Sequence, residues 1–557
     1  MFGMKNSRQG EALERALAGH YRLLLVSSLV VAFVVAWQLR FVQDDAFISF
    51  TFAKSLVEGN GLTWFGSPVE GYTNFLWVMW IALGMKLGIE PIAWSYAGGL
   101  ASLVGCVWCL WEISGRVFKE HLPMLLTVLF FIGNFSVLSY ATGGLETMLQ
   151  TFLLSLSFLL ACLITADEEI KGSPCILLSL TVAAAVLTRL DSAVIVSLIV
   201  LYALISIVSK KSPLKNSLAL LLPAAIILLG WFAWRWSFYG KLLPNTYYAK
   251  VGWDERSFSN GILYLGRFLH WYLLWPIILL GLAGMVRRRR RLDRPMRLAL
   301  FIIAAWFVYI VAVGGDFMEF RFIIPVAPFL FLWVAYLVHH HIAGALVRNE
   351  VVVATLAVAI LTAASIQHGR SFNSLTEDKT LDSIEMLSTF YGVYPDHDFR
   401  TIGRRMKEEL GETGATISTS AVGSIPFYGG LRTVDGIGLC DENVNDPGSY
   451  WQSPGYRPGH LHRVNMSYLK RKGVNFVLDQ PKLVIRGVLN RLESAGALAG
   501  WILHAAHRDQ PPDNIETVVA MPLDARTSLL MLYLTPTAEL DSVVRSRSWE
   551  VARVRLY

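Results

Sequence analysis

Apolar runs of roughly 15 to 22 residues recur through the first two thirds of this 557-residue chain, and each is long enough to cross a hydrocarbon layer of ~30 Å as a helix. With 54% hydrophobic and only 16% charged side chains, the chain is too apolar to be a single soluble core. The sequence therefore predicts a polytopic α-helical membrane protein. The twelve runs lie near residues 22–40, 73–88, 92–114, 122–140, 147–164, 174–188, 192–208, 217–238, 268–286, 298–313, 322–338 and 350–366.

Basic residues near helix ends indicate the cytoplasmic side, which predicts that residues 1–21 are cytoplasmic and that the first loop, 41–72, faces outward. The first run lacks a small-residue cleavage site, so we interpret it as a retained helix. The basic pattern around Arg116 requires runs 73–88 and 92–114 to make one net crossing, with one of them re-entrant or interfacial. We therefore expect about 11 transmembrane helices within a module spanning residues 22–370.

The composition changes after residue 367, where charged residues, proline and glycine become more frequent. Residues 371–557 are predicted to form a soluble periplasmic α/β domain. Short runs at 415–420, 474–480, 516–523 and 528–536 are typical of strands, and 398–412 and 482–498 have helical spacing.

The net charge of +7 reflects the cytoplasmic loops, and basic stripes interleaved with aromatic residues are missing, so we expect no nucleic-acid partner. Five cysteines form no recognisable disulfide or metal pattern. We interpret His339 to His341 as part of a cytoplasmic loop rather than as a metal site, because a site needs a full ligand set in fixed geometry.

Polar residues gather at the outward ends of the apolar runs, where each charge at membrane depth costs about 2.5 to 3.5 kcal/mol. Asp44 and Asp45 stand side by side just after the first run. Alone, each polar residue is equally explained as an interfacial anchor or a helix cap. Together they predict a shared polar cavity, and the further candidates for it are Glu70, Tyr72, Asn74, Glu146, Arg189, Asn245, Tyr247, Lys250, Asp316 and Arg321.

Two kinds of chemistry are present in this set. Adjacent carboxylates repel each other, which favours proton uptake, so Asp44 or Asp45 is the candidate base. Arg189, Lys250 and Arg321 are cations suited to a leaving phosphate. A base and a phosphate clamp together indicate group transfer from a phosphorylated lipid.

Several segments resemble the polyprenyl-phosphate-dependent glycosyltransferases of the GT-C fold class, and among them the family of the mycobacterial terminal β-(1→2) arabinofuranosyltransferase. Residues 22–330 carry the resemblance in order, and it continues in 421–444 and 458–478. The segments are DDAFISFTFAKSLVEGNGLTW, PVEGYTNFLWV, GLET, LTRLDS, LPNTYYAK and GGDFMEFRFIIP. One departure is that Leu190 and Ser192 stand where the family pattern has proline and glycine around Asp191.

The resemblance implies an enzyme of the bacterial inner membrane that takes a sugar, arabinofuranose or another pentose or hexose, from a polyprenyl phosphate. The acceptor would be a cell-envelope glycan or lipid. The catalytic acidic residue of the first outer loop maps onto Asp44 or Asp45, and positions 189, 245, 250, 316 and 321 would line the donor pocket. A divalent cation held by Asp44, Asp45 and Glu70 stays open. So do a polyprenyl-linked sugar transporter or flippase, and a non-enzymatic envelope glycan-binding protein.

Overall fold

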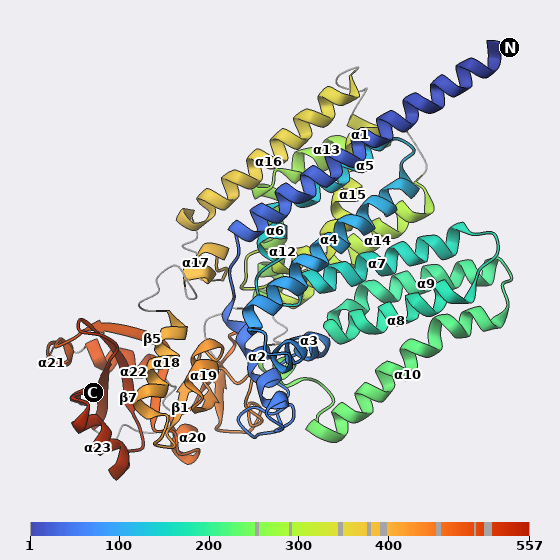
Figure 1. Ribbon diagram of the computed structural model, residues 1–557. Coiled ribbons are helices and arrows are strands. Elements are labelled where there is room, and N and C mark those ends of the chain that lie inside the picture. The colour runs from blue at the N-terminus through green and yellow to red at the C-terminus, as the bar shows by residue number, and fades with distance from the viewer. Residues whose placement is uncertain are drawn as a thin grey trace. The chain divides into compact units, whose positions relative to one another are not determined.

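The computed structural model describes residues 2–250, 255–288, 292–342, 349–375, 380–389, 398–452, 458–494, 497–505 and 515–555, and Figure 1 shows its elements in chain order. These residues belong to two compact units. The first, which we call the helical unit, consists of residues 1–41, 95–232 and 255–383. The second, which we call the mixed unit, consists of residues 42–94, 233–254 and 384–557.

Long apolar helices build the helical unit, and residues 91–94 of α4 and 233–239 of α10 belong to the mixed unit (Figure 1). Their bounds are α1 Phe2–Gln38, α4 Pro91–Val117, α5 His121–Ile132, α6 Phe135–Ser139, α7 Thr147–Ala166, α8 Gly172–Thr188, α9 Ala193–Ser209, α10 Leu214–Tyr239, α12 Glu255–Trp271, α13 Leu274–Arg288, α14 Arg294–Val313, α15 Ala327–Leu337 and α16 Glu350–Leu375. Two short 3₁₀ turns, η1 Leu190–Ser192 and η2 Arg321–Val326, and one π-helical turn, η3 Val338–Ile342, lie between them.

Eight helices among the described residues are long and apolar enough to cross a membrane, or nine if α12 and α13, which meet at a bend of 87°, form one span. This is fewer than the twelve apolar runs. The run at 122–140 is interrupted where α5 ends at Gly133 and Asn134 caps α6 by accepting a hydrogen bond from the backbone N–H of Val137 at 3.1 Å. The run at 73–88 becomes α3, Phe75–Lys86, whose 12 residues reach only ~18 Å.

Burial differs sharply along these helices. In the segment Arg321–Ile342, which includes α15, 89% of the apolar window is buried, whereas in α10 the corresponding fraction is 11%. Large apolar side chains such as Ile226 and Leu229 on α10 are therefore exposed. An apolar helix with an apolar exposed surface is expected where lipid replaces water as the surroundings.

The mixed unit contains a six-stranded sheet with the strand order β2-β1-β5-β7-β6-β8. The pairs β1–β2 and β1–β5 are parallel, and the pairs β5–β7, β7–β6 and β6–β8 are antiparallel. A separate hairpin pairs β3 with β4. The strands are β1 Thr416–Thr419, β2 Arg432–Asp435, β3 Tyr450–Gln452, β4 His462–Val464, β5 Phe476–Ile485, β6 Ile515–Pro522, β7 Thr527–Tyr533 and β8 Glu550–Arg555.

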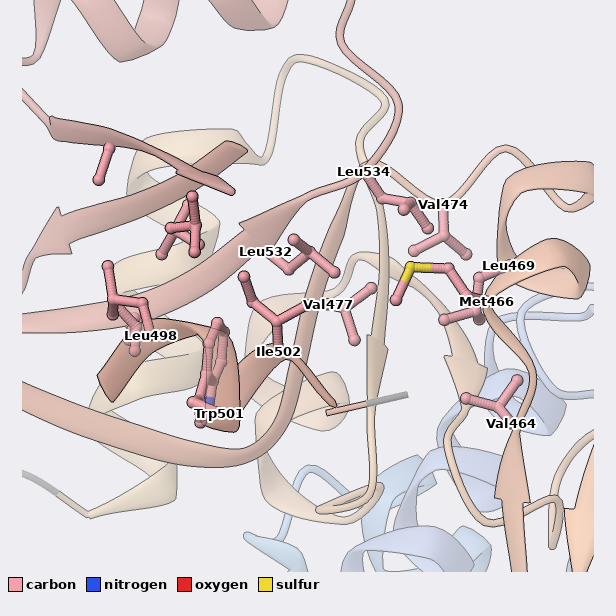
Figure 2. Close-up of a cluster of buried hydrophobic side chains, with 14 of the residues drawn as sticks. Val464, Met466, Leu469, Val474, Val477, Leu498, Trp501, Ile502, Leu532 and Leu534 are labelled. Carbon is pink, nitrogen blue, oxygen red and sulfur yellow. The ribbon is translucent and has the colours of Figure 1, made fainter. Parts of the chain in front are cut away.

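Both faces of this sheet are buried. Successive strand residues point to opposite sides, so one strand contributes side chains to two cores. On β7, Leu530 and Leu532 enter one core while Leu529 and Met531 enter the other. Figure 2 shows the first core, in which Leu532 and Val477 lie near Ile502 and Trp501. The unit's helices are α2 Asp44–Val57, α3, α11 Asn245–Lys250, α17 Ile384–Thr389, α18 Phe399–Leu410, α19 Ser424–Gly429, α20 Met466–Arg471, α21 Leu489–Ser494, α22 Ala497–Ala505 and α23 Ala538–Ser546.

Most of the expected elements of this sheet are confirmed: β1, β5, β6 and β7 coincide with the four predicted strands, and α18 with the first predicted helix. The helix predicted at 482–498 is wrong in its first part. Residues 482–485 continue β5 and pair with β7 in the register Lys482 to Leu530, so helix formation is displaced to α21 and α22.

Candidate functional site

The two adjacent aspartates lie in the first turn of α2, within the mixed unit. The side chain of Gln43 caps this helix by accepting a hydrogen bond from the backbone N–H of Asp45. The carboxylate of Asp44 accepts hydrogen bonds from the backbone N–H groups of Gly423, at 3.1 Å, and Ser424, at 2.7 Å. Asp44 therefore ties the start of α2 to the start of α19.

Asp45 differs from its neighbour. Its side chain is half-buried, and within the described ranges no hydrogen bond or ion pair engages its carboxylate. The structure thus separates the two aspartates, which the sequence left equivalent: one carboxylate is bound by backbone amides and the other is available to a ligand.

Gly423 must be glycine for this contact. A Cβ atom at this position would lie 2.1 Å from both the backbone oxygen and one carboxylate oxygen of Asp44, far inside van der Waals contact. The close approach of the two backbones is what allows the N–H group to reach the carboxylate.

Glu70 is buried and paired with Arg235 near the end of α10, at 2.6 to 2.7 Å. Arg235, only 1% exposed, also donates to the backbone oxygen of Leu242 at 2.8 Å. Desolvation raises the pKa of the Glu70 carboxyl, and the guanidinium opposes that shift. Sequence reasoning missed Arg235, although a single arginine inside the apolar run 217–238 was the available signal.

Tyr72 and Asn74 fold back onto α2 and its surroundings. The hydroxyl of Tyr72 lies 3.0 Å from that of Tyr239, and its ring packs edge-on against Phe52. The amide of Asn74 exchanges hydrogen bonds with the hydroxyl of Ser49 at 3.0 to 3.1 Å. Both residues are buried and hold the first loop against the helix that carries Asp45.

Asn245 joins two further segments. Its backbone N–H donates to the backbone oxygen of Glu70 at 3.0 Å. Its side-chain amide lies 2.8 to 3.0 Å from the carbonyl oxygens of Gly438, Leu439 and Asp441. Asn245 is therefore engaged by the protein, a structural role that the sequence did not indicate.

Tyr247 is 42% exposed and packs edge-on against Tyr248. Lys250 is the last residue of α11, and its side chain lies outside the described residues.

In the helical unit, Glu146, Arg189 and Asp191 form one buried cluster. Arg189 donates to Glu146 at 2.8 Å and to Asp191 at 2.7 Å, so the guanidinium bridges two carboxylates. The side-chain amide of Gln150 donates to Oδ1 of Asp191 at 2.8 Å. The Tyr309 hydroxyl lies 3.4 Å from Oδ2 of Asp191, the oxygen that Arg189 contacts at 2.7 Å. The turn at 190–192, where the family pattern has proline and glycine, is the 3₁₀ turn η1.

Asp316 and Arg321 form a second buried ion pair at 2.6 Å. The guanidinium of Arg321 lies 5.2 Å from the ring centre of Phe322, and that of Arg189 lies 5.5 Å from the same ring. Two of the three predicted phosphate-binding cations therefore share one aromatic neighbour. The cluster carries three carboxylates and two guanidinium groups, which gives a formal charge of −1.

A buried glutamate, which lies between Asp316 and Arg321 in the sequence, is paired with a buried histidine. Glu319 lies 2.7 Å from Nε2 of His368 on α16 and 3.4 Å from the hydroxyl of Ser136. That hydroxyl is in turn 2.7 Å from Tyr272. Sequence reasoning missed His368, because a contact between residues 319 and 368 has no local signature.

The sequence left open a divalent cation bound by Asp44, Asp45 and Glu70, and the described residues do not support it. Among the described residues no group of three His, Cys, Asp or Glu side chains converges as a metal site requires. Asp44 binds backbone amides and Glu70 binds Arg235.

The three neighbouring histidines lie in the π-helical turn η3, which corrects the loop interpretation for residues 339–341. His339 lies 3.3 Å from Glu120 and 3.7 Å from Glu350.

Comparison with known proteins confirms the resemblance seen in the sequence. The chain is 26% identical over 324 residues to the terminal β-(1→2)-arabinofuranosyltransferase of Mycobacterium tuberculosis, and the match covers 51% of each protein. The chain thus spans about half the length of this curated relative. A domain family of unknown function, DUF8728, matches residues 391–525.

Two solved structures have the same fold. The ArnT of Cupriavidus metallidurans bound to undecaprenyl phosphate has a TM-score of 0.56 at 13% identity, covering 92% of this chain and 98% of that one. The archaeal oligosaccharyltransferase AglB of Archaeoglobus fulgidus, in complex with an inhibitory peptide and a dolichol-phosphate, has a TM-score of 0.52 at 12% identity, covering 91% and 74%. The chain therefore has the GT-C membrane fold with a C-terminal sheet domain.

Proposed function

We propose that this chain, which has the fold of two enzymes solved with polyprenyl-type phosphate lipids, is a membrane glycosyltransferase. It moves a sugar from a polyprenyl phosphate to a cell-envelope glycan or lipid. The names of the curated relatives favour arabinofuranose as the sugar. In this proposal the membrane is the bacterial inner membrane, and residues 371–557 and the first loop, 41–72, face the periplasm.

The observation that carries the proposal is the contrast between the adjacent aspartates. Asp44 is engaged by two backbone N–H groups and serves the fold, whereas the carboxylate of Asp45 is uncommitted among the described residues. We assign Asp45 as the general base. It takes the proton of an acceptor hydroxyl, the hydroxyl oxygen attacks the anomeric carbon, and the bond from that carbon to the phosphate oxygen breaks with its electron pair leaving on polyprenyl phosphate.

Arg321 and Arg189 are the proposed contacts to the leaving phosphate. Guanidinium groups suit this role because their planar donors match phosphate oxygens. Lys250 is the third cation that we propose for the phosphate, on the basis of the sequence resemblance. Glu146 and Asp316 would then orient the two arginines.

The other candidates shape the site in this proposal. Glu70, Tyr72, Asn74 and Asn245 fix the first loop, and Tyr247 offers an exposed ring to the sugar.

The test uses the purified full chain in lipid nanodiscs, incubated with polyprenyl-phosphate sugars that differ only in the sugar. We expect sugar release or transfer from one donor, measured by mass spectrometry of the lipid. Movement of intact donor between leaflets without sugar loss would instead identify a flippase. Glycan binding with no donor consumed would identify a non-enzymatic receptor.

A further inference from the structure

The mixed unit contains a hollow that the proposed chemistry of transfer does not use. It lies between the first loop and the strand β2, and its empty space of about 380 Å³ includes its open mouth. Two aromatic residues of the first loop, Trp64 and Phe65, contribute to its lining. So do four charged residues: Arg432, Asp441, Glu442 and Lys472.

The two aromatic residues lie in a tight turn with an unusual backbone conformation. Trp64 and Ser67 exchange backbone hydrogen bonds of 2.9 Å in both directions. Between them Phe65 has φ +45° and Gly66 has φ +87°. Two positive φ values in a two-residue turn are the pattern for which Asn, Asp or Gly is favoured, and a bulky residue there costs on the order of 1–3 kcal/mol.

Trp64 fixes this turn against the sheet. Its indole N–H donates to the backbone oxygen of Thr433 on β2 at 2.9 Å, and the side chain is buried. The ring of Phe65 meets it edge-on at 5.1 Å between centres. The strained backbone therefore holds a large, half-buried ring at the hollow, where a turn without a ligand role would be more stable with glycine or asparagine.

The charged residues that line the hollow carry no net charge. Lys472 lies 3.7 Å from Glu442, and Asp441 accepts from the hydroxyl of Tyr468 at 2.8 to 2.9 Å. Arg432 is exposed, and within the part of the chain that the structure describes its guanidinium has no hydrogen-bond or ion-pair partner. Two cations and two carboxylates give no net charge, so the wall offers donors and acceptors without attracting an anion.

We propose that this hollow is a binding subsite for a neutral oligosaccharide, the glycan acceptor of the transfer. The proposal rests on the function proposed above. The ring of Phe65 packs on the apolar face of a sugar, and Arg432 and Glu442 meet its hydroxyl groups. A balanced wall beside an aromatic ring fits a ligand rich in hydroxyl groups and poor in charge, and does not fit the phosphate end of the donor.

The decisive variant is Phe65→Gly, because glycine suits the left-handed backbone while removing the ring. The matched control is Ser548→Gly, which replaces another residue with positive φ, +54°, in the same unit and outside the hollow. Binding of a synthetic neutral arabinofuranosyl oligosaccharide is measured by calorimetry on the full chain without donor. Donor consumption is measured separately on the same preparations.

We expect Phe65→Gly and Arg432→Ala each to weaken oligosaccharide binding about tenfold or more, as for a central binding residue. The thermal stability of Phe65→Gly should be unchanged or higher, and Ser548→Gly should bind as the wild type does. Unchanged binding in Phe65→Gly, or no binding to the wild type, overturns the subsite even if donor is consumed. Wild-type binding that Phe65→Gly weakens, with no donor consumed from any lipid sugar, supports a glycan site but contradicts the proposed transfer.

Discussion

The paired arginines of the helical unit and the adjacent aspartates of the mixed unit are held in different ways. In the helical unit, Arg189 and Arg321 are each bound to carboxylates at 2.6 to 2.8 Å. In the mixed unit, Asp44 is bound by backbone N–H groups, and Asp45 beside it is left uncommitted among the described residues. A charge fully paired within the protein maintains geometry, whereas an uncommitted carboxylate can exchange a proton with a ligand. We therefore expect variants of Asp45 to lose activity while they stay stable. Variants of the paired arginines, which are also the proposed phosphate contacts, should lose stability and activity together.

The largest effect is expected for Asp45→Asn. Removal of a general base lowers the rate about 10²- to 10⁴-fold while the helix cap at Gln43 remains. The measurement is the initial rate of sugar transfer by variants of equal membrane content. Asp44→Asn is the matched control, for which we expect reduced thermal stability and a smaller loss of rate. Equal rates for Asp45→Asn and the wild type would remove Asp45 from the chemistry.

Arg189→Ala tests the paired side of the comparison. It leaves Glu146 and Asp191 buried without their cation, which costs about 3–5 kcal/mol when a buried pair is broken. We expect a clear fall in the unfolding temperature of the nanodisc-embedded protein. Arg297→Ala, an exposed arginine at the start of α14, should change stability by no more than about 0.5 kcal/mol. Equal stability of the two variants would contradict the structural role of the bridge.

Asp435 is a second carboxylate of the mixed unit that is bound by backbone N–H groups, and it makes the stability of the unit depend on pH. Asp435 accepts from the backbone N–H groups of Ile437, Gly438 and Cys440, yet burial raises the pKa of its carboxyl to about 7. Because the folded-state pKa exceeds the unfolded value, its contribution to stability is complete below pH ~4 and is lost as the pH rises toward 7.

Thermal unfolding across pH 4 to 7 should therefore show a decline that Asp435→Asn flattens. An unchanged slope in Asp435→Asn would show that other groups cause the decline.

The smallest effect is expected for Gly423→Ala. The added Cβ meets Asp44, so the turn must shift at a cost of about 1–3 kcal/mol. Gly500→Ala, in helix α22, is the control. A Cβ atom at position 500 would meet nothing within 4 Å. The comparison is the difference in unfolding temperature between these two variants. A Gly423→Ala protein as stable as the control would mean that the Asp44 contact is looser than described.

The sequence predicted the elements that depend on local pattern. Short apolar runs identified β6 and β7, and long apolar runs identified α7, α9 and α14. It failed at residues 482–485, where pairing with β7 overrides helical spacing. It also treated residues 122–140 as one span, because an apolar stretch does not reveal the break at Gly133 between α5 and α6.

For the candidate site, the sequence identified residue types but not partners. It placed Glu146, Arg189 and Asp191 in one large set of polar residues, but it did not predict that Arg189 bridges the two carboxylates. It could not separate Asp44 from Asp45, because the amides that bind Asp44 lie about 380 residues further along the chain. Contacts that distant depend on the folded sheet domain and leave no periodic signal.

The most direct test of the central claim is a structure of the Asp45→Asn protein with its polyprenyl-phosphate sugar and an acceptor oligosaccharide bound. This variant should be slow enough to hold both substrates. We expect the acceptor hydroxyl oxygen within about 2.6–3.2 Å of the side chain at position 45, on the side facing the anomeric carbon. An acceptor hydroxyl that instead contacts another carboxylate, with residue 45 remote from the sugar, would contradict it.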